Sequence, residues 1–465
     1  MERTKQIRPF GWRDKVGYMF GDFGNDFTFI FASLYLMVFY TKVLGVSAEM
    51  VGTLFLVSRC VDAFTDVTMG RIVDKTKTGK NGRFRPWILR MSGPVAIASF
   101  LMYQSSMANA SMTMKVVYMF VTYILWGSVF YTSINIPYGS MASALSADPE
   151  ERASLSTFRS LGAALASVLI GTIAPFLIYT TDAAGNQIVE GPRITLIAGI
   201  FSIGAFVCYL VCYRMTVERV KIEPEQNGEK VGIVKTLKTL GSNRALLGII
   251  LAAIMLLLAS LLTQSVNQYV FIDYFKDKGA LSVMTLLGML PTFLLVPFVG
   301  PITKKLGKKE ASAIGCIIGG CSSLLLFFLQ VDSSALFIGI SIIGYIGFGF
   351  FNMVIWAIIT DVIDDQEVRT GKREDGTIYA VYSFARKIGQ ALAGGLGGYA
   401  LALIGYDETV QVQTQAVANG IYNIATLVPG ILYIGVGLVL LFIYPLSRKK
   451  VNENIEILNK KRAGN

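Results

Sequence analysis

The stretches GRIVDKTKTGK at residues 70–80 and GPITKKLGKKE at residues 300–310 carry similar text 230 residues apart. Each begins with a glycine at the end of an apolar run and continues into a lysine-rich turn. A second pair, FRSLGAALA at residues 158–166 and ARKIGQALA at residues 385–393, follows in the same order. This repetition predicts that the chain consists of two related halves.

Long apolar runs make up both halves. The 465-residue chain is 53% hydrophobic and 16% charged, against roughly 25% charged residues in an average soluble domain. An apolar run of about 20 residues can cross ~30 Å of hydrocarbon as a helix. Twelve membrane helices are expected, at residues 17–41, 48–71, 87–107, 115–145, 156–180, 192–215, 244–270, 280–303, 309–330, 334–361, 376–404 and 420–446.

The longest polar stretch between these runs, VERVKIEPEQNGEKVG, divides them into two sets of six. We therefore expect a six-helix bundle over residues 1–215, a central loop over 216–243, a second bundle over 244–447 and a tail over 448–465. Two parallel six-helix repeats are typical of the major facilitator fold, an all-α membrane fold. Its substrate binds near mid-membrane at the repeat interface.

The net charge of +11 is spread unevenly over the segments that connect the apolar runs. Basic residues crowd the N-terminus, alternate loops and the C-terminal tail, whereas the intervening loops are nearly bare. The positive-inside rule therefore predicts that both termini and the central loop are cytoplasmic, and no nucleic-acid partner is needed to explain the charge. The first apolar run lacks a cleavage site with small residues, so we expect it to remain as a helix.

The segment RCVDAFTD, residues 59–66, places ionisable groups inside an apolar run. Arg59, Asp62 and Asp66 have helical spacing and should share one face. Because each charge costs about 3 kcal/mol at a helix centre, the three must meet protein or water. One explanation is a structural ion network. The other is a cation site, in which Na⁺ held by both aspartates and a hydroxyl such as Thr132, or a proton on one carboxylate, balances the excess negative charge.

Other polar groups lie within predicted helices. Asp22 and Asp26 are four residues apart in GDFGNDF, and Thr132 and Asn135 share a face near Pro137. Asn135 could simply satisfy backbone groups freed by the proline, and Arg159 in the next helix could extend to the membrane surface. Taken together, these groups form an inventory that can hydrogen-bond a polyhydroxylated ligand.

The motifs of several enzyme classes are missing from the sequence. It contains no GxxxxGK[ST] phosphate loop, no HExxH motif and no histidine at all. We therefore expect neither an enzyme nor an ATP-driven pump, and we expect no cofactor and no metal beyond a possible Na⁺.

Six motifs resemble one transporter family along nearly the whole chain, in order: FGDFGNDF, RCVDAFTDVTMGRIVD, GRFRPW, INIPYGS, STFRSLG and DVIDDQEVRTGKREDG. The family is that of the glycoside–pentoside–hexuronide:cation symporters, which includes the melibiose, glucuronide and xyloside carriers. The resemblance implies uptake of a sugar or glycoside, coupled to Na⁺ or H⁺, by alternating access. It further implies a multi-pass protein of a bacterial inner membrane, surrounded by lipid and functional as a monomer.

The resemblance also implies roles for individual residues. It implies that Asp62 and Asp66 bind the coupling cation with Thr132, and that Asp26 binds sugar hydroxyls. Arg159 and Lys387 should lie near the sugar, and Asp361 and Arg373 should belong to a cytoplasmic gate. To these we add Arg59 as the charge partner in its helix, and Asn135 and Tyr131 as sugar contacts.

Two departures from the melibiose carriers bear on the substrate. Asn135 and Gly139 stand where those carriers have aspartate and tryptophan, and NIPYGS is more similar to the glucuronide and xyloside carriers. Asp26 against Arg159 and Lys387 would leave one positive charge, which favours a carboxylate-bearing sugar unless Asp22 also faces the site. We therefore favour a hexuronide or pentoside. The alternative function is a sugar sensor that keeps the fold without transport.

Overall fold

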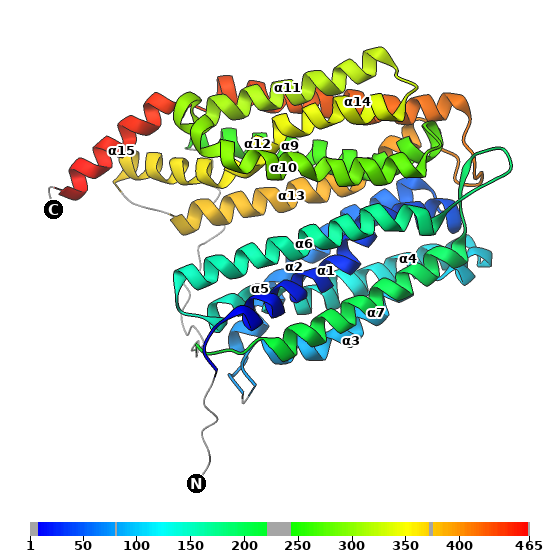
Figure 1. Ribbon diagram of the computed structural model, residues 1–465, viewed down its shortest axis with the longest axis horizontal. Coiled ribbons are helices and arrows are strands. Elements are labelled where there is room, and N and C mark those ends of the chain that lie inside the picture. The colour runs from blue at the N-terminus through cyan, green and yellow to red at the C-terminus, as the bar shows by residue number, and fades with distance from the viewer. Residues whose placement is uncertain (1–7, 80, 221–242, 372–374, 464–465) are drawn as a thin grey trace, which may run out of the picture. The chain divides into compact units, whose positions relative to one another are not determined.

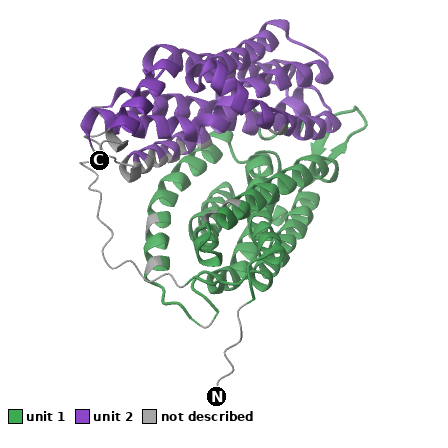
Figure 2. Cartoon of the chain, turned by 60° about the vertical axis from the view of Figure 1, so that its left-hand side comes forward, with its two compact units in different colours: residues 1–228, 406–412 green, residues 229–405, 413–465 purple. Residues whose placement is uncertain are grey.

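The computed structural model describes residues 8–79, 81–220, 243–371 and 375–463. The chain divides into two compact units (Figure 2). Unit 1 comprises Met1–Gly228 with Tyr406–Val412, and unit 2 comprises Glu229–Gly405 with Gln413–Asn465. Most of the expected central loop lies outside the described residues.

Unit 1 consists of long helices joined by short turns (Figure 1). They are α1 (Trp12–Val38), α2 (Ala48–Lys75), α3 (Arg85–Leu101), α4 (Met112–Ile124), α5 (Thr132–Leu145), α6 (Pro149–Ile178) and α7 (Gly191–Met215). Two stretches of π-helix continue this pattern, η1 (Phe39–Val43) after α1 and η3 (Leu125–Tyr131) between α4 and α5. A 3₁₀ turn, η2 (Ser105–Asn109), follows α3.

Unit 2 is built in the same way. Its helices are α9 (Arg244–Tyr269), α10 (Lys278–Leu306), α11 (Lys308–Leu329), α12 (Ser334–Thr370), α13 (Asp375–Leu403), α14 (Gln415–Leu438) and α15 (Arg448–Ala463). The π-helical stretches η4 (Val270–Tyr274) and η5 (Val439–Ile443) continue α9 and α14.

Each of the twelve expected apolar runs corresponds to a helical segment. Within the described ranges, nine helices are long and apolar enough to cross a membrane. The segments outside this group are α2, which carries the ionisable cluster, α3, which has 17 residues, and α13, whose apolar part is Ile388–Leu403. The all-helical membrane fold is confirmed, whereas twelve crossings and cytoplasmic termini stay predictions.

One small β-hairpin was not expected from the sequence. Strands β1 (Tyr179–Thr181) and β2 (Gln187–Val189) pair antiparallel after α6, with Tyr179 opposite Val189. Gly185 turns the chain with a φ of 84°, a left-handed conformation that glycine adopts without steric cost. The hairpin leads the chain from α6 into α7.

Helix pairing is the same in the two units. In unit 1, α1 packs against α6 and α7, and α3 packs against α7 and α5. In unit 2 the corresponding α9 packs against α13 and α14, and α11 packs against α14 and α12. This agreement is the structural counterpart of the sequence repeat.

Glycines allow the closest of these approaches. A Cβ atom added to Gly347 of α12 would lie 2.3 Å from the carbonyl oxygen of Gly315 in α11, and the reverse distance is also 2.3 Å. Any side chain at either position would push the helices apart. The glycine-rich stretch at residues 344–350 therefore serves close helix packing in unit 2.

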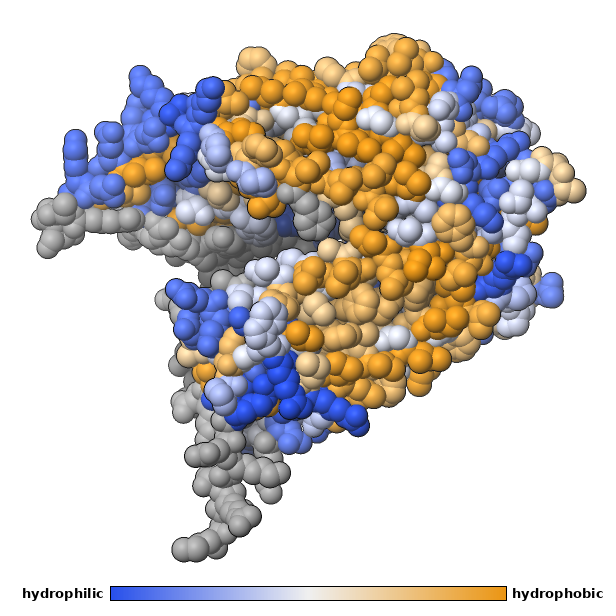
Figure 3. Space-filling view, in the orientation of Figure 1, coloured by the Kyte–Doolittle hydropathy of each residue, from blue (hydrophilic) through white to orange (hydrophobic). Residues whose placement is uncertain are grey.

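The exposed surface of the helices is largely hydrophobic. In each unit, apolar side chains cover the middle of the helices on the face shown in Figure 3, and hydrophilic residues gather toward the helix ends. Large apolar side chains that are more than half exposed, such as Phe64, Ile203, Phe298 and Phe442, are not expected in numbers on water-facing helices. They fit a surface that is covered by lipid.

Candidate functional site

The ionisable residues of α2 lie together, as their spacing predicts. Arg59 Nη1 lies 3.2 Å from Asp62 Oδ2, and both side chains are half-buried. Asp66 lies one turn further along the same helix, on the same face. The cluster therefore combines one guanidinium with two carboxylates.

Two hydroxyl groups approach these carboxylates, one from η3 and one from the first residue of α5. Ser128 Oγ donates to Asp62 Oδ1 at 2.6 Å, and Thr132 Oγ1 lies 3.1 Å from Asp66 Oδ1. Carboxylate and hydroxyl oxygens are ligands that suit hard cations. The four side chains can supply such oxygens to a cation.

The π-helical stretch η3 explains why both hydroxyls face α2. Thr132 Oγ1 also lies 3.2 Å from the carbonyl oxygen of Gly127, five residues earlier. A π-bulge widens the helix and re-aims the residues that follow it, and such bulges concentrate at functional sites. Sequence reasoning missed Ser128, although its spacing of four residues from Thr132 was a usable signal.

Replacing Ser128 by alanine should weaken cation binding about tenfold or more, because a hydrogen bond to a charged group contributes about 1.5–3 kcal/mol. The measurement is the concentration of Na⁺ or H⁺ that gives half-maximal sugar uptake. Ser133→Ala is the matched control, since Ser133 is half-buried and, among the described residues, its hydroxyl bonds only the carbonyl oxygen of Val129. Equal effects of the two substitutions would remove Ser128 from the site.

A second charged cluster lies on α1 and α6. Arg159 Nε lies 3.0 Å from Asp22 Oδ1, and Asp22 is buried while the arginine side chain keeps 43% of its surface exposed. The guanidinium also lies over the ring of Tyr138, 5.5 Å from its centre. Arg159 is therefore held by a carboxylate and does not simply extend to the membrane surface.

Asp26 lies one turn after Asp22 on the same face of α1. It is half-buried. Among the described residues, no side chain or backbone group forms a hydrogen bond or ion pair with its carboxylate, which is unusual for a carboxylate inside an apolar helix. Asp26 is thus available to a ligand.

Asn135 belongs to a small polar network. Asn25 Nδ2 lies 3.4 Å from Asn135 Oδ1, and the buried Tyr209 hydroxyl donates to Asn25 Oδ1 at 2.9 Å. The asparagine therefore contacts α1, and among the described residues no hydrogen bond joins its side chain to backbone freed by Pro137. Asn25 and Tyr209 were not predicted, because only the fold brings α1, α5 and α7 together here.

Tyr131 occupies the region between the two clusters. Its ring stacks on that of Phe29 of α1, with 5.6 Å between the ring centres, and packs at an angle against Trp126, with 5.5 Å between the ring centres. Arg59 in turn lies over the Phe29 ring at 6.0 Å. One face of Tyr131 is thus packed, and its role toward a sugar stays a prediction.

The predicted residues of unit 2 are less fully described. Lys387 lies in α13, and its side chain falls outside the described part of the structure, as does Arg373. Asp361 of α12 is buried, and its Oδ1 lies 2.6 Å from Lys308 Nζ, with which it forms an ion pair. The gate roles of Asp361 and Arg373 therefore stay predictions, and Lys308 is the observed partner of the aspartate.

Comparison with known proteins gives a consistent result. The family model described as MFS/sugar transport protein matches residues 17–448. The chain is 34% identical over 464 residues to the glucuronide carrier protein homolog of Escherichia coli (strain K12), covering 98% of this chain and 97% of that protein. It is 32% identical over 457 residues to the putative glycoside/cation symporter YagG of the same organism, covering 97% and 95%.

Among solved structures, the nucleoside transporter NupG is similar in fold. Its TM-score is 0.66 at 12% identity, and the match covers 93% of this chain and 100% of that one. Together with the family model, this likeness identifies the fold as that of the major facilitator superfamily. The chain belongs to the MFS/sugar transport protein family, as the motifs indicated, and its relatives and structural neighbours are transporters and not enzymes.

Proposed function

We propose that the protein is a secondary active symporter that imports a sugar glycoside, either a hexuronide or a pentoside, together with Na⁺ or H⁺. The observation that carries the proposal is the coexistence in unit 1 of two different charged clusters. One pairs two carboxylates with two hydroxyls, and the other presents a carboxylate that has no partner among the described residues. A transporter that couples two solutes needs a site for each.

The cluster on α2 is the proposed cation site. Arg59, Asp62 and Asp66 sum to one negative charge when ionised, which is costly inside a membrane helix. One Na⁺ or one proton would neutralise the cluster. Cation binding would thereby favour the conformational change that carries the loaded protein between its outward and inward states. Arg59 orients Asp62 in this scheme.

The cluster on α1 and α6 is the proposed sugar site. Asp26 would accept hydrogen bonds from two sugar hydroxyls, and charge-assisted bonds of this kind are the strong ones. Asn135 and Tyr131 are further contacts in this proposal. The amide of Asn135 can both donate and accept, whereas the aspartate of the melibiose carriers only accepts.

The contact between Asp22 and Arg159 changes the charge argument for the substrate. A free Arg159 would favour a sugar carboxylate, but here Asp22 already neutralises the guanidinium. A neutral pentoside therefore needs no rearrangement. A hexuronide has to compete with Asp22. One relative is named a glucuronide carrier protein homolog, which supports keeping a hexuronide as a candidate substrate.

Asp22→Asn should raise the ratio of β-glucuronide to β-xyloside uptake about tenfold, because it releases the guanidinium for a substrate carboxylate. Initial uptake rates of both labelled sugars provide the measurement. The double variant Asp22→Asn with Arg159→Gln removes both charges and should bring the ratio back toward the original value. An unchanged ratio in the single variant would show that Arg159 does not contact the substrate carboxylate.

Uptake by vesicles tests the function as a whole. A labelled β-glucuronide, β-xyloside and α-galactoside are each offered with an imposed Na⁺ gradient or an imposed pH gradient. Accumulation of one sugar under one gradient would identify both solutes. Saturable sugar binding without any accumulation would instead favour the sensor.

A further inference from the structure

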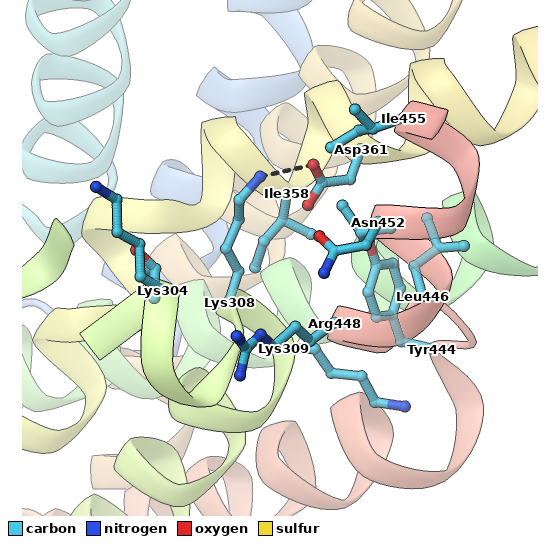
Figure 4. Close-up of a pocket in the computed structure, with 13 residues that line it drawn as sticks. Lys304, Lys308, Lys309, Ile358, Asp361, Tyr444, Leu446, Arg448, Asn452 and Ile455 are labelled. Carbon is cyan, nitrogen blue, oxygen red and sulfur yellow. Dashed lines mark hydrogen bonds and ion pairs between the residues drawn. The ribbon is translucent and has the colours of Figure 1, made fainter. Parts of the chain in front are cut away.

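A cavity of about 440 Å³ opens at one end of unit 2 (Figure 4). Its walls come from the end of α10, the start of α11, the middle of α12 and the start of α15. All of its lining residues belong to unit 2, whereas both charged clusters described above belong to unit 1. Asp361, a predicted gate residue, lines the cavity, whereas its other lining residues have no role in the proposed transport cycle.

The charges around this cavity are mostly positive. Lys304, Lys308, Lys309 and Arg448 line it, and Asp361 is the one acidic residue among the lining side chains. Lys308 is already paired with Asp361, and Figure 4 shows Lys304 turned away from that pair. Lys304, Lys309 and Arg448 therefore remain as a positive excess.

One carboxylate outside the lining offsets part of this excess. Glu310 Oε1 accepts the backbone N–H of Arg448 at 3.3 Å, so it binds the backbone of the arginine and not its guanidinium. The guanidinium donates through Nη1 to the carbonyl oxygen of Lys305 at 2.6 Å, which fixes its position. Its remaining N–H groups form no hydrogen bond with another described residue, so they can bind a ligand.

A buried hydroxyl in the cavity wall lacks a partner. Tyr444 is 1% exposed, and its hydroxyl forms no hydrogen bond with any residue in the described part of the chain. A buried hydroxyl in this state costs about 1–3 kcal/mol relative to a bonded one. Because Tyr444 lines the cavity, an acceptor atom of a ligand can satisfy it.

The first turn of α11 adds partial positive charge. Its N-cap is Gly307, which lines the cavity, has a φ of 100° and provides no side chain to bond the first N–H groups. Glu310 stands in the same first turn with its carboxylate against Gly307, and it offsets part of this charge. The N-terminus of a 22-residue helix still attracts anions, phosphate in particular. The helix end, the basic side chains and the Tyr444 hydroxyl thus favour the same kind of ligand.

We propose that this cavity binds a phosphate ester. Arg448, Lys309 and the first turn of α11 contact the phosphate oxygens, Lys304 closes over them from the rim, and the Tyr444 hydroxyl donates to one of them. The partly exposed Ile455 and the apolar Leu446 and Val451 also line the cavity, which favours a phospholipid headgroup over a soluble ester. The positive-inside rule places this end on the cytoplasmic side, where anionic lipids attract basic residues.

Binding to the purified full-length protein in detergent tests this site. The probes are dihexanoyl phosphatidylglycerol, for the lipid headgroup, and glycerol 3-phosphate, for the soluble ester. The double variant Lys304→Gln with Lys309→Gln should weaken binding about tenfold to thirtyfold. Tyr444→Phe, which removes one atom that has no partner among the described residues, should weaken it about fivefold without lowering Tm.

Two lysines of α15 provide a matched control. Lys449 and Lys450 are exposed and do not line the cavity, so Lys449→Gln with Lys450→Gln removes the same charge from the same end of the unit. Binding within twofold of the original protein supports a specific site. The proposed site would be overturned if this control lost as much binding as the Lys304→Gln, Lys309→Gln double variant. It would also be overturned if the original protein bound neither probe. Binding of the lipid alone identifies a headgroup, and equal binding of both probes identifies a soluble ester.

Discussion

Asp66→Asn is expected to abolish cation-driven accumulation of sugar while leaving sugar exchange in place. The substitution keeps the size of the side chain and an acceptor for Thr132 but removes one negative charge. The α2 cluster then sums to zero without any cation, so the carrier resembles its loaded form at all times. Sugar can still move down its own gradient, but cation entry no longer drives it.

The size of the expected effect follows from the driving force. One elementary charge moving through 100 mV provides about 2.3 kcal/mol, which corresponds to about a 50-fold concentration ratio. In the variant this ratio should fall to about one. Steady-state accumulation and the exchange of labelled against unlabelled sugar in the same vesicles are the two measurements.

Glu49→Gln is the control for this experiment, because Glu49 is an exposed carboxylate in the first turn of the same helix. It should accumulate sugar like the original protein. Asp62→Asn is a less clean variant, since it also removes the charge partner of the half-buried Arg59. Retained accumulation by Asp66→Asn would move the cation site away from α2.

Helical periodicity made the α2 cluster predictable. Arg59, Asp62 and Asp66 share a face in any α-helix, and the cost of burying charge required a partner for them. Thr132 was predicted through the resemblance to the symporter family. Ser128 was missed although its four-residue spacing from Thr132 places both hydroxyls on one face of an α-helix, and the structure shows it donating to Asp62.

Contacts between helices were harder to predict from the sequence than the residues that share one face of a single helix. The charge of Asp22 was visible in the sequence, but its contact with Arg159 depends on how α1 packs against α6. The same holds for Asn25 with Tyr209 and for Lys308 with Asp361. Periodicity predicts which residues point the same way, and only packing decides which of them meet.

Asp26→Asn is expected to weaken sugar binding by at least 100-fold. A carboxylate that accepts two sugar hydroxyls contributes about 1.5–3 kcal/mol for each bond, and the neutral amide retains only one weaker acceptor. Isothermal titration of the purified protein with the transported sugar measures the loss. Asp26→Ala should have a still larger effect, because it removes both oxygens.

Thermal stability separates this role from a structural one. Asp26 has no partner among the described residues, so its replacement by asparagine breaks no described contact and relieves a half-buried charge. We expect Tm to stay the same or to rise, because residues kept for binding often reduce the stability of the folded protein. Asp22→Asn is the matched comparison four residues away, where Tm should fall because Arg159 loses its ion pair. If Asp26→Asn lowered Tm and left sugar binding intact, Asp26 would be a structural residue and the sugar site would lie elsewhere.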